Sequence, residues 1–136
     1  MEIKVRQLKG VQFAVRTRTH TVICDQPQDN GGMDQGMTPP EFMLASLGSC
    51  AAFYAAQYLR SRGLAEGGVE VTVNAEKLKA PARLGSFRVN VHSPVPLAAD
   101  QQEAMMRSVQ ACLIHNTLMT PPQIAIELHV PEHAAA

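Results

Sequence analysis

The sequence predicts an α+β fold, and three patterns in it lead to that prediction. Segments that alternate apolar and polar residues lie on both sides of one long helical pattern, and a second helical pattern precedes a last alternating segment. With 136 residues, 46% of them hydrophobic, the chain is long enough for one domain with its own core. We therefore expect a single domain over 1–136, with a tail from about residue 131 that has nothing to pack against and frays.

Three short strands are expected first, as an antiparallel meander. MEIKVRQLKG and VQFAVRTRT both alternate, and HTVICD is rich in β-branched residues. The next segment, QPQDNGGMDQGM, has no period of 2 or 3.6 and is rich in Gly, Asp and Gln. It predicts a loop, and its length is typical of a functional one.

The long helix that follows has recognisable signals at both ends. Thr38 fits an N-cap, Pro39 the first helical position and Glu41 the acid of a capping box, while Gly63 fits the position just beyond the C-terminus. Apolar residues recur at spacings of three and four and form a stripe that is expected to be buried. The stripe consists of Met43, Leu44, Leu47, Cys50, Ala51, Tyr54 and Tyr58.

The second half of the chain predicts a hairpin, two helices and a strand. GVEVTVNAEKL and GSFRVNVHSP alternate with period two, with the turn expected at 81–85. Helical spacing predicts a helix over 98–112 and a further helical turn over 115–119. Pro121 and Pro122 end that turn, and QIAIELHV predicts the final strand.

Composition excludes several classes of function. The net charge is zero without a basic block, and aromatic residues are only 4%, so a nucleic-acid partner is not expected. No run of 18 apolar residues indicates a membrane span, and the charged start MEIKVRQL does not resemble a signal peptide. We expect a cytoplasmic protein whose three cysteines are mostly reduced.

Each cysteine admits a structural and a chemical interpretation. Cys50 lies far beyond the first turn of the helix, so the helix dipole cannot activate it, and without a cation it would be an inert buried thiol. Cys112 closes the expected second helix, where the dipole disfavours a thiolate, so it is a better resolving thiol than a first nucleophile. Cys24 lies on a β segment with Val22 on the same face and no charge partner for its thiol, which favours simple core packing.

The nearest cations in the pattern are Arg16 and Arg18. With His20 they alternate along the second expected segment, so in one strand all three face the same way. They form either a solvated face or an arginine fork that pairs with a thiolate. Glu41 has the same ambiguity, since its carboxylate can cap the helix or hold an arginine side chain.

A metal site is a weak interpretation of the same residues. Cys112 and His115 have a C-x-x-H spacing, but a structural zinc site needs four ligands and no second pair exists. We expect neither a metal nor a cofactor.

Two motifs resemble one known family. TPPEFMLASLGSCAAFYAAQYLRSRGL resembles the central helix of the OsmC/Ohr family of osmotically inducible and organic-hydroperoxide-resistance proteins, and QACLIHNTL is similar to that family's Cys-Pro-Val-His-x-x-Leu segment. The order of expected elements also fits over nearly the whole chain. Two departures matter: Leu113 replaces the usual proline, and the spacing from Glu41 to Cys50 is that of the OsmC-like branch.

The resemblance implies an OsmC-like fold, an intertwined homodimer and a thiol-dependent peroxidase acting on organic hydroperoxides, with hydrogen peroxide as a further substrate. It implies Cys50 as the peroxidatic cysteine, Cys112 as the resolving cysteine that forms a disulfide with it, Arg16 or Arg18 as the activating residue, and Glu41 as its support. A small dithiol or lipoyl-type group is the implied reductant. The peroxide would lie in a dry pocket, whose candidate wall residues are Met33, Met37, Phe42 and Phe53.

Two other functions remain open on the same fold. One is a non-enzymatic protein that binds an apolar small molecule, with Cys50 as a lining residue. The other is a redox sensor that forms the same disulfide once and signals through a change of shape.

Overall fold

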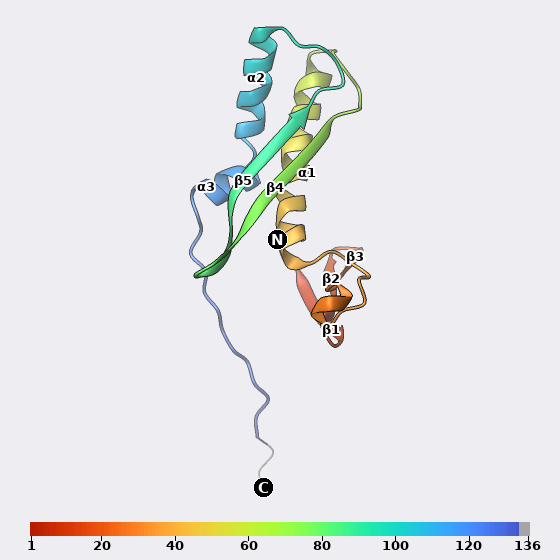
Figure 1. Ribbon diagram of the computed structural model, residues 1–136, viewed down its shortest axis with the longest axis vertical. Coiled ribbons are helices and arrows are strands. Elements are labelled where there is room, and N and C mark those ends of the chain that lie inside the picture. Colours follow the sequence, from red (N-terminus) through yellow and green to blue (C-terminus); the bar gives the residue numbers. More distant parts are fainter. Residues whose placement is uncertain (134–136) are drawn as a thin grey trace.

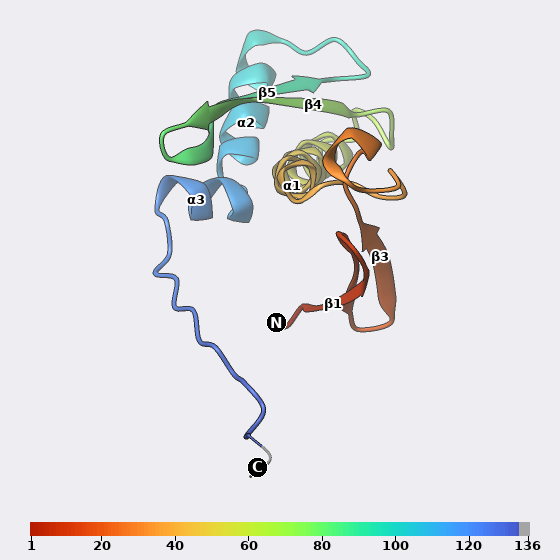
Figure 2. The same ribbon diagram turned by 60° about the horizontal axis from the view of Figure 1, so that its bottom comes forward.

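The structure, a computed structural model, describes residues 1–133, and residues 134–136 of the expected frayed tail lie outside the described part. The fold class is confirmed: helices and two small antiparallel sheets form an α+β arrangement (Figure 1). The larger part, here called the body, consists of one long helix, a two-stranded sheet and two shorter helices. The smaller part, here called the N-terminal sheet, stands apart from the body in both ribbon views (Figures 1 and 2).

The N-terminal sheet is the expected meander of β1 (Lys4–Lys9), β2 (Gln12–Thr17) and β3 (His20–Cys24). Its register places Val5 opposite Val15 and Val15 opposite Val22. Directly opposed residues of antiparallel strands share a face, so these valines form an apolar face. Val5 and Val22 are nevertheless exposed, which leaves this face uncovered.

The turn between β2 and β3 is earlier than the alternation predicted. Arg18 and Thr19 form a two-residue turn, and Arg18 has a left-handed backbone with φ 51°. His20 pairs with Thr17, whereas Arg16 pairs with Thr21, so Arg16 and His20 lie on opposite faces. The expectation that Arg16, Arg18 and His20 share one face is therefore wrong.

The loop after β3 contains one 3₁₀ turn, η1 (Gln28–Asn30), and leads into α1 (Pro39–Ser61). The helix has Thr38 as its N-cap and Pro39 as its first residue, and Gly63 follows its end with φ 65°. Both helix ends are thus confirmed, because the cap residues satisfy or complement the terminal backbone groups whatever the helix packs against.

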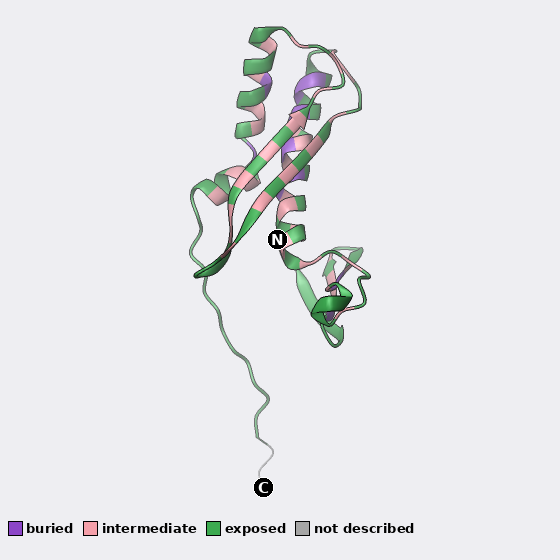
Figure 3. Ribbon diagram, in the orientation of Figure 1, coloured by how far each residue is buried: buried purple, intermediate pink, exposed green. Residues whose placement is uncertain are grey.

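The body is built around α1, which packs on β4 (Glu70–Lys79), β5 (Ala82–His92) and α2 (Ala99–Gln110). Gly48 lets α1 approach the sheet, because a Cβ there would lie 3.0 Å from Val73 Cγ2. The buried centre contains Ala55, Tyr58, Leu59 and Met105 (Figure 3). The hairpin is confirmed, although its turn is at 80–81 and residues 82–85, expected in the loop, belong to β5.

The α1 helix is, within residues 1–133, the one helix long and apolar enough to cross a membrane. A core helix of a soluble protein meets the same criteria, and α1 packs along the sheet and α2. Its composition therefore does not indicate a membrane span.

The chain ends with α3 (Leu113–Met119) and an extended segment over 120–133 that leads away from the body (Figure 2). The final strand expected in QIAIELHV is not formed. Its apolar residues Ile124, Ile126, Leu128 and Val130 are all exposed. A strand needs a neighbour to which its backbone can hydrogen-bond, and no strand within residues 1–133 pairs with this segment.

Candidate functional site

The structure brings Cys50 and Cys112 together. Cys50 lies in the middle of α1 and is half-buried, whereas Cys112 lies between α2 and α3 and is only 1% exposed. Both are free thiols, and Cys50 is close enough to Cys112 to raise the pKa of the Cys112 thiol. Two residues 62 positions apart in the sequence therefore form a thiol pair with one accessible and one covered member.

Cys112 does not close a helix, as the spacing had predicted, but begins one. The α2 helix ends at Gln110, and Cys112 is the N-cap of α3, where its Sγ accepts a hydrogen bond from the His115 N–H at 3.5 Å. The helical path is interrupted between α2 and α3, where Cys112 adopts an extended ψ of 134°.

The surroundings of Cys112 keep it protonated. Burial raises the pKa of the Cys112 thiol, the hydrogen bond with Cys50 raises it further, and the backbone N–H groups of His115 and Ile114 oppose this only in part. A thiol with a raised pKa is a poor first nucleophile. The pair is therefore asymmetric, with Cys50 as the more exposed sulfur.

His115 has a feature that the sequence did not reveal. Its Nδ1 is buried and, among the side chains of residues 1–133, is the buried nitrogen or oxygen without a hydrogen-bond partner. The C-x-x-H spacing was the only signal available for it. No group of three His, Cys, Asp or Glu residues in the same range is arranged to hold a metal ion.

Arg16 and Arg18 are not brought to the thiol pair in the single chain. They lie at the end of the N-terminal sheet and, with Lys4, line a cavity of about 350 Å³ on its surface. Neither arginine has a hydrogen-bond or ion-pair partner within residues 1–133. Their guanidinium groups are thus free to meet an anion from elsewhere.

Glu41 caps α1. Its Oε2 accepts a hydrogen bond of 2.7 Å from the Thr38 N–H. This bond and a further one with the Thr38 side chain lower the pKa of Glu41, and the charge of Lys77 contributes in the same direction. In the single chain its carboxylate is engaged with the helix terminus and not with an arginine.

Asp25 is a buried carboxylate that the sequence analysis missed. Burial acts to raise its pKa, but hydrogen bonds from the N–H groups of Gln26, Gln35 and Met33 and from the Gln12 side chain outweigh burial, so the pKa of Asp25 is lowered. These bonds fasten the loop after β3 onto the N-terminal sheet. Only the richness of that loop in glycine, which allows its backbone N–H groups to converge, hinted at such an anchor.

The four residues proposed as pocket walls do not line one cavity around Cys50. Phe53 is 59% exposed and contacts Tyr54 edge to face, with ring centroids 5.3 Å apart. Met37 forms a backbone bridge with Cys24 at the end of β3, and the backbone N–H of Met33 donates to the Asp25 carboxylate. A dry peroxide pocket would require a further surface to cover them.

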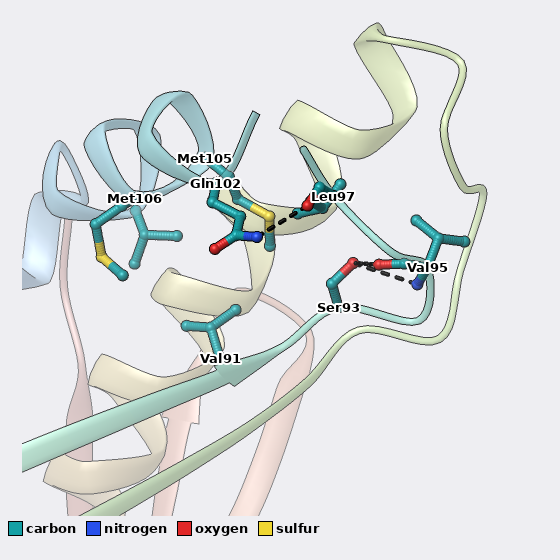
Figure 4. A pocket seen from close by; sticks show the side chains of 8 residues that line it. Val91, Ser93, Val95, Leu97, Gln102, Met105 and Met106 are labelled. Atoms are coloured by element: carbon teal, nitrogen blue, oxygen red, sulfur yellow. Dashed lines mark hydrogen bonds between the residues drawn. The ribbon is translucent and has the colours of Figure 1, made fainter. Parts of the chain in front are cut away.

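A separate apolar cavity of about 310 Å³ lies between β5, the loop after it and α2 (Figure 4). The polar groups at its rim bond within the chain, since Gln102 donates to the Leu97 carbonyl at 2.8 Å and Ser93 to the Val95 carbonyl at 2.7 Å. Neither Cys50 nor Cys112 lines it. Its other lining residues are Val91, Met105, Met106 and Val109.

Comparison with known proteins gives consistent results. A family model described as OsmC-like protein matches residues 32–127, a range that includes both cysteines. A search of curated proteins found no match.

Solved structures share the fold. A structure of an OsmC-like protein from Mycoplasma pneumoniae has 16% sequence identity and a TM-score of 0.72, with 88% of this chain and 87% of that chain covered. A protein from Psychrobacter arcticus 273-4, described as an osmotic stress induced and detoxification response protein, has 18% identity and a TM-score of 0.77, covering 85% of each chain. An organic hydroperoxide resistance protein from Legionella pneumophila has 16% identity and a TM-score of 0.64, covering 87% of this chain and 89% of that one.

Proposed function

The chain belongs to the OsmC-like protein family, and from this premise we propose that it is a thiol-dependent peroxidase that reduces organic hydroperoxides, with hydrogen peroxide as a further substrate. Family membership and the hydroperoxide-resistance neighbour support a peroxidase-like or stress-response role. The observation that carries the finer proposal is the asymmetric thiol pair. Cys50 is half-buried, and Cys112 is buried next to it with a raised pKa.

The reaction proceeds in two steps on the protein. The Cys50 thiolate attacks the distal oxygen of the hydroperoxide, the O–O bond breaks, and the products are a Cys50 sulfenic acid and an alkoxide that takes up a proton to become an alcohol. Cys112 then attacks the Cys50 sulfur, so that the disulfide forms and the hydroxyl leaves as water with the Cys112 proton. A small dithiol or lipoyl-type reductant restores both thiols and is itself oxidised to a disulfide.

A second copy of the chain supplies what the single chain lacks. Arg16 or Arg18 of one subunit faces Cys50 of the other, and Glu41 helps to orient that arginine. Three observations support a homodimer: the partnerless arginines, the uncovered valine face of the N-terminal sheet, and the exposed apolar residues over 124–130. No nucleic acid or membrane is involved, and the proposed location is the cytoplasm, where thiols stay reduced.

The arginine alone cannot supply the whole rate. A thiol of ordinary pKa is about 3% thiolate at pH 7, so complete ionisation gains at most about thirtyfold, and nucleophilicity falls as the pKa falls. The remaining acceleration comes from holding the peroxide in line and stabilising the leaving oxygen.

The test is a single-turnover titration of reduced protein with cumene hydroperoxide, followed by mass spectrometry of every thiol. Wild-type protein is expected to lose two thiols into a Cys50–Cys112 disulfide, Cys112→Ser to stop at the Cys50 sulfenic acid, and Cys50→Ser to be inert. Cys24→Ser is the matched control and should behave as wild type. Survival of all thiols, or reaction of Cys24 first, would contradict the proposal.

A second candidate function is the binding of an apolar small molecule, and the cavity between β5 and α2 is the observation that favours it. Its volume is at the lower end of the range for small-molecule sites. The discriminating variant is Met106→Trp, which extends a larger side chain into this cavity from a residue that is 53% exposed. Loss of the biological role in that variant with peroxide turnover intact would favour ligand binding over peroxide reduction.

A further inference from the structure

Lys4 and Arg16 form a cross-strand pair of like charges that destabilises the N-terminal sheet. The register places these two residues directly opposite each other on β1 and β2, so their like charges share a face. Like charges directly opposed across strands destabilise a sheet. Glu2 offsets only part of this, since its Oε1 lies 3.7 Å from Lys4 Nζ and both side chains are more than three-quarters exposed.

Arg18 adds a third cation at an equally unfavourable position. It has φ 51° in the two-residue turn between β2 and β3, where glycine or asparagine normally provides the left-handed conformation. An arginine held in this region costs conformational energy, and such residues gather at functional sites. Its guanidinium group, like that of Arg16, is without a partner in the described range.

Charge is unevenly divided along the chain. The first 24 residues contain five of the 12 Lys and Arg residues but one of the 12 acidic residues, although the whole chain has zero net charge. Lys4, Arg16 and Arg18 converge on one cavity of about 350 Å³ whose only acidic lining residue is Glu2. The cavity thus has a formal charge of plus two. One positive charge would neutralise a single thiolate, and one would remain.

We propose that Lys4, together with Arg16 and Arg18, binds a carboxylate group on the hydroperoxide. Lys4 is then a specificity-determining residue for carboxylate-bearing peroxides. The inference rests on the proposed function. One guanidinium group faces the Cys50 thiolate of the other subunit, and the remaining positive charge holds the substrate carboxylate a few ångströms from the reacting oxygen. Planar carboxylates match the donor fork of arginine, and the lysine adds a flexible point charge.

The experiment compares two peroxides that differ only in charge: cumene hydroperoxide with a para-carboxylate and the methyl ester of the same compound. Pre-reduced protein reacts with each in a single turnover without reductant, and thiol loss gives the two rate constants. We expect the carboxylate to react about three- to fivefold faster at low ionic strength, with the ratio falling toward one in about 0.5 M salt.

Variants distinguish binding of the carboxylate in the cavity from nonspecific attraction of an anion to a basic surface. Lys4→Gln should lower the ratio toward one and Lys4→Arg should retain it. The matched control is Arg6→Gln, which removes the same charge on the same strand but outside the cavity, and it should leave the ratio as in wild type. Circular dichroism should show all three variants folded, because both side chains are exposed.

Each other outcome overturns a defined claim. Equal rates for the two peroxides in wild-type protein would overturn the pocket but leave the peroxidase proposal intact. A ratio that falls equally in Lys4→Gln and Arg6→Gln would show nonspecific steering and also overturn it. If the wild-type thiols survive both peroxides, the proposed function fails, and the specificity proposal fails with it.

Discussion

The body and the N-terminal sheet are stabilised by different kinds of interaction. The body buries an apolar centre in which Leu59 and Ala55 are almost fully covered by α2 and the β4–β5 hairpin. The N-terminal sheet has an uncovered valine face, and its most buried side chain is the carboxylate of Asp25. One region is held by apolar packing and the other by strand pairing and a polar anchor.

This difference assigns the two regions different roles. Contiguous exposed apolar residues such as those of the valine face are typical of surfaces that bind another surface. The body contains Cys50 and Cys112, and the N-terminal sheet contains the partnerless arginines. In the proposed homodimer, burial of the valine face would bring an arginine of one subunit to the thiol of the other, which connects the fold with the proposed chemistry.

The largest expected effect concerns the apolar centre of the body. Leu59→Ala removes a side chain that is 1% exposed and should lower the free energy of unfolding by about 3 kcal/mol, since the cavity it leaves cannot fully collapse. The matched control, Leu8→Ala in β1, removes the same atoms from a half-exposed site and should cost less than about 0.5 kcal/mol. Denaturant unfolding measures both. Equal costs would mean that Leu8 is as deeply covered as Leu59 in solution, and the contrast between the regions would fail.

A somewhat smaller effect is expected for association. Ile126 is 91% exposed in the single chain, and burial of one such side chain in a dimer contributes about 1.5–3 kcal/mol. Ile126→Asp should therefore raise the dimer dissociation constant by at least about tenfold in sedimentation equilibrium, with the body still folded. Glu127→Gln is the control, because it changes the adjacent residue on the opposite side of an extended segment. An unchanged constant for Ile126→Asp would exclude this segment from the interface.

The Asp25 anchor should affect the N-terminal sheet alone. Asp25→Asn replaces an oxygen that accepts backbone hydrogen bonds with an amide nitrogen that cannot, so the loop after β3 should detach more often. The amides of Met33 and Gln35 should exchange with solvent about tenfold faster, while those of α1 and β4 keep wild-type rates. Equal acceleration in the body would show that the two regions open as one unit.

Local chemistry decided which parts of the structure were predictable. The ends of α1 and the β4–β5 hairpin follow from caps, helical spacing and alternation, all of which act within a few residues. The break at Cys112 and the turn at Arg18 were missed because neither position has the glycine, proline or asparagine that normally signals one. The strand expected over 123–130 depends on a neighbour that the single chain does not provide.

The same distinction between local and distant determinants applies to the candidate site. The approach of Cys50 to Cys112 follows from packing within the body, and the family resemblance implied it. The arginines could not be positioned from spacing, because their location relative to the thiols depends on how the N-terminal sheet is arranged against the body. Asp25 and the buried Nδ1 of His115 have only weak sequence signals, the glycine-rich loop and the C-x-x-H spacing, since burial of a polar group is decided by distant parts of the chain.

The smallest expected effect separates the cap role of Glu41 from any role in catalysis. The pKa of Glu41 is lowered from its ordinary value of 4.5, first by the hydrogen bond from the Thr38 N–H, so the ionised carboxylate stabilises the fold above that ordinary value. This contribution is lost as the pH falls through the lowered pKa. Glu41→Gln retains the hydrogen bond without the charge, and its melting temperature should be about 1–2 °C below wild type at pH 7.

The two melting temperatures should converge well below pH 4.5, where both side chains are neutral. Glu66→Gln, which removes an exposed ion pair with Arg60, should show almost no difference at either pH. A Glu41→Gln difference that persists in acid would mean that the charge does not act at the helix terminus. If the variant instead keeps its melting behaviour but loses peroxide reduction by tenfold or more, the carboxylate holds the arginine of the other subunit, and the N-terminal sheet then docks against the start of α1.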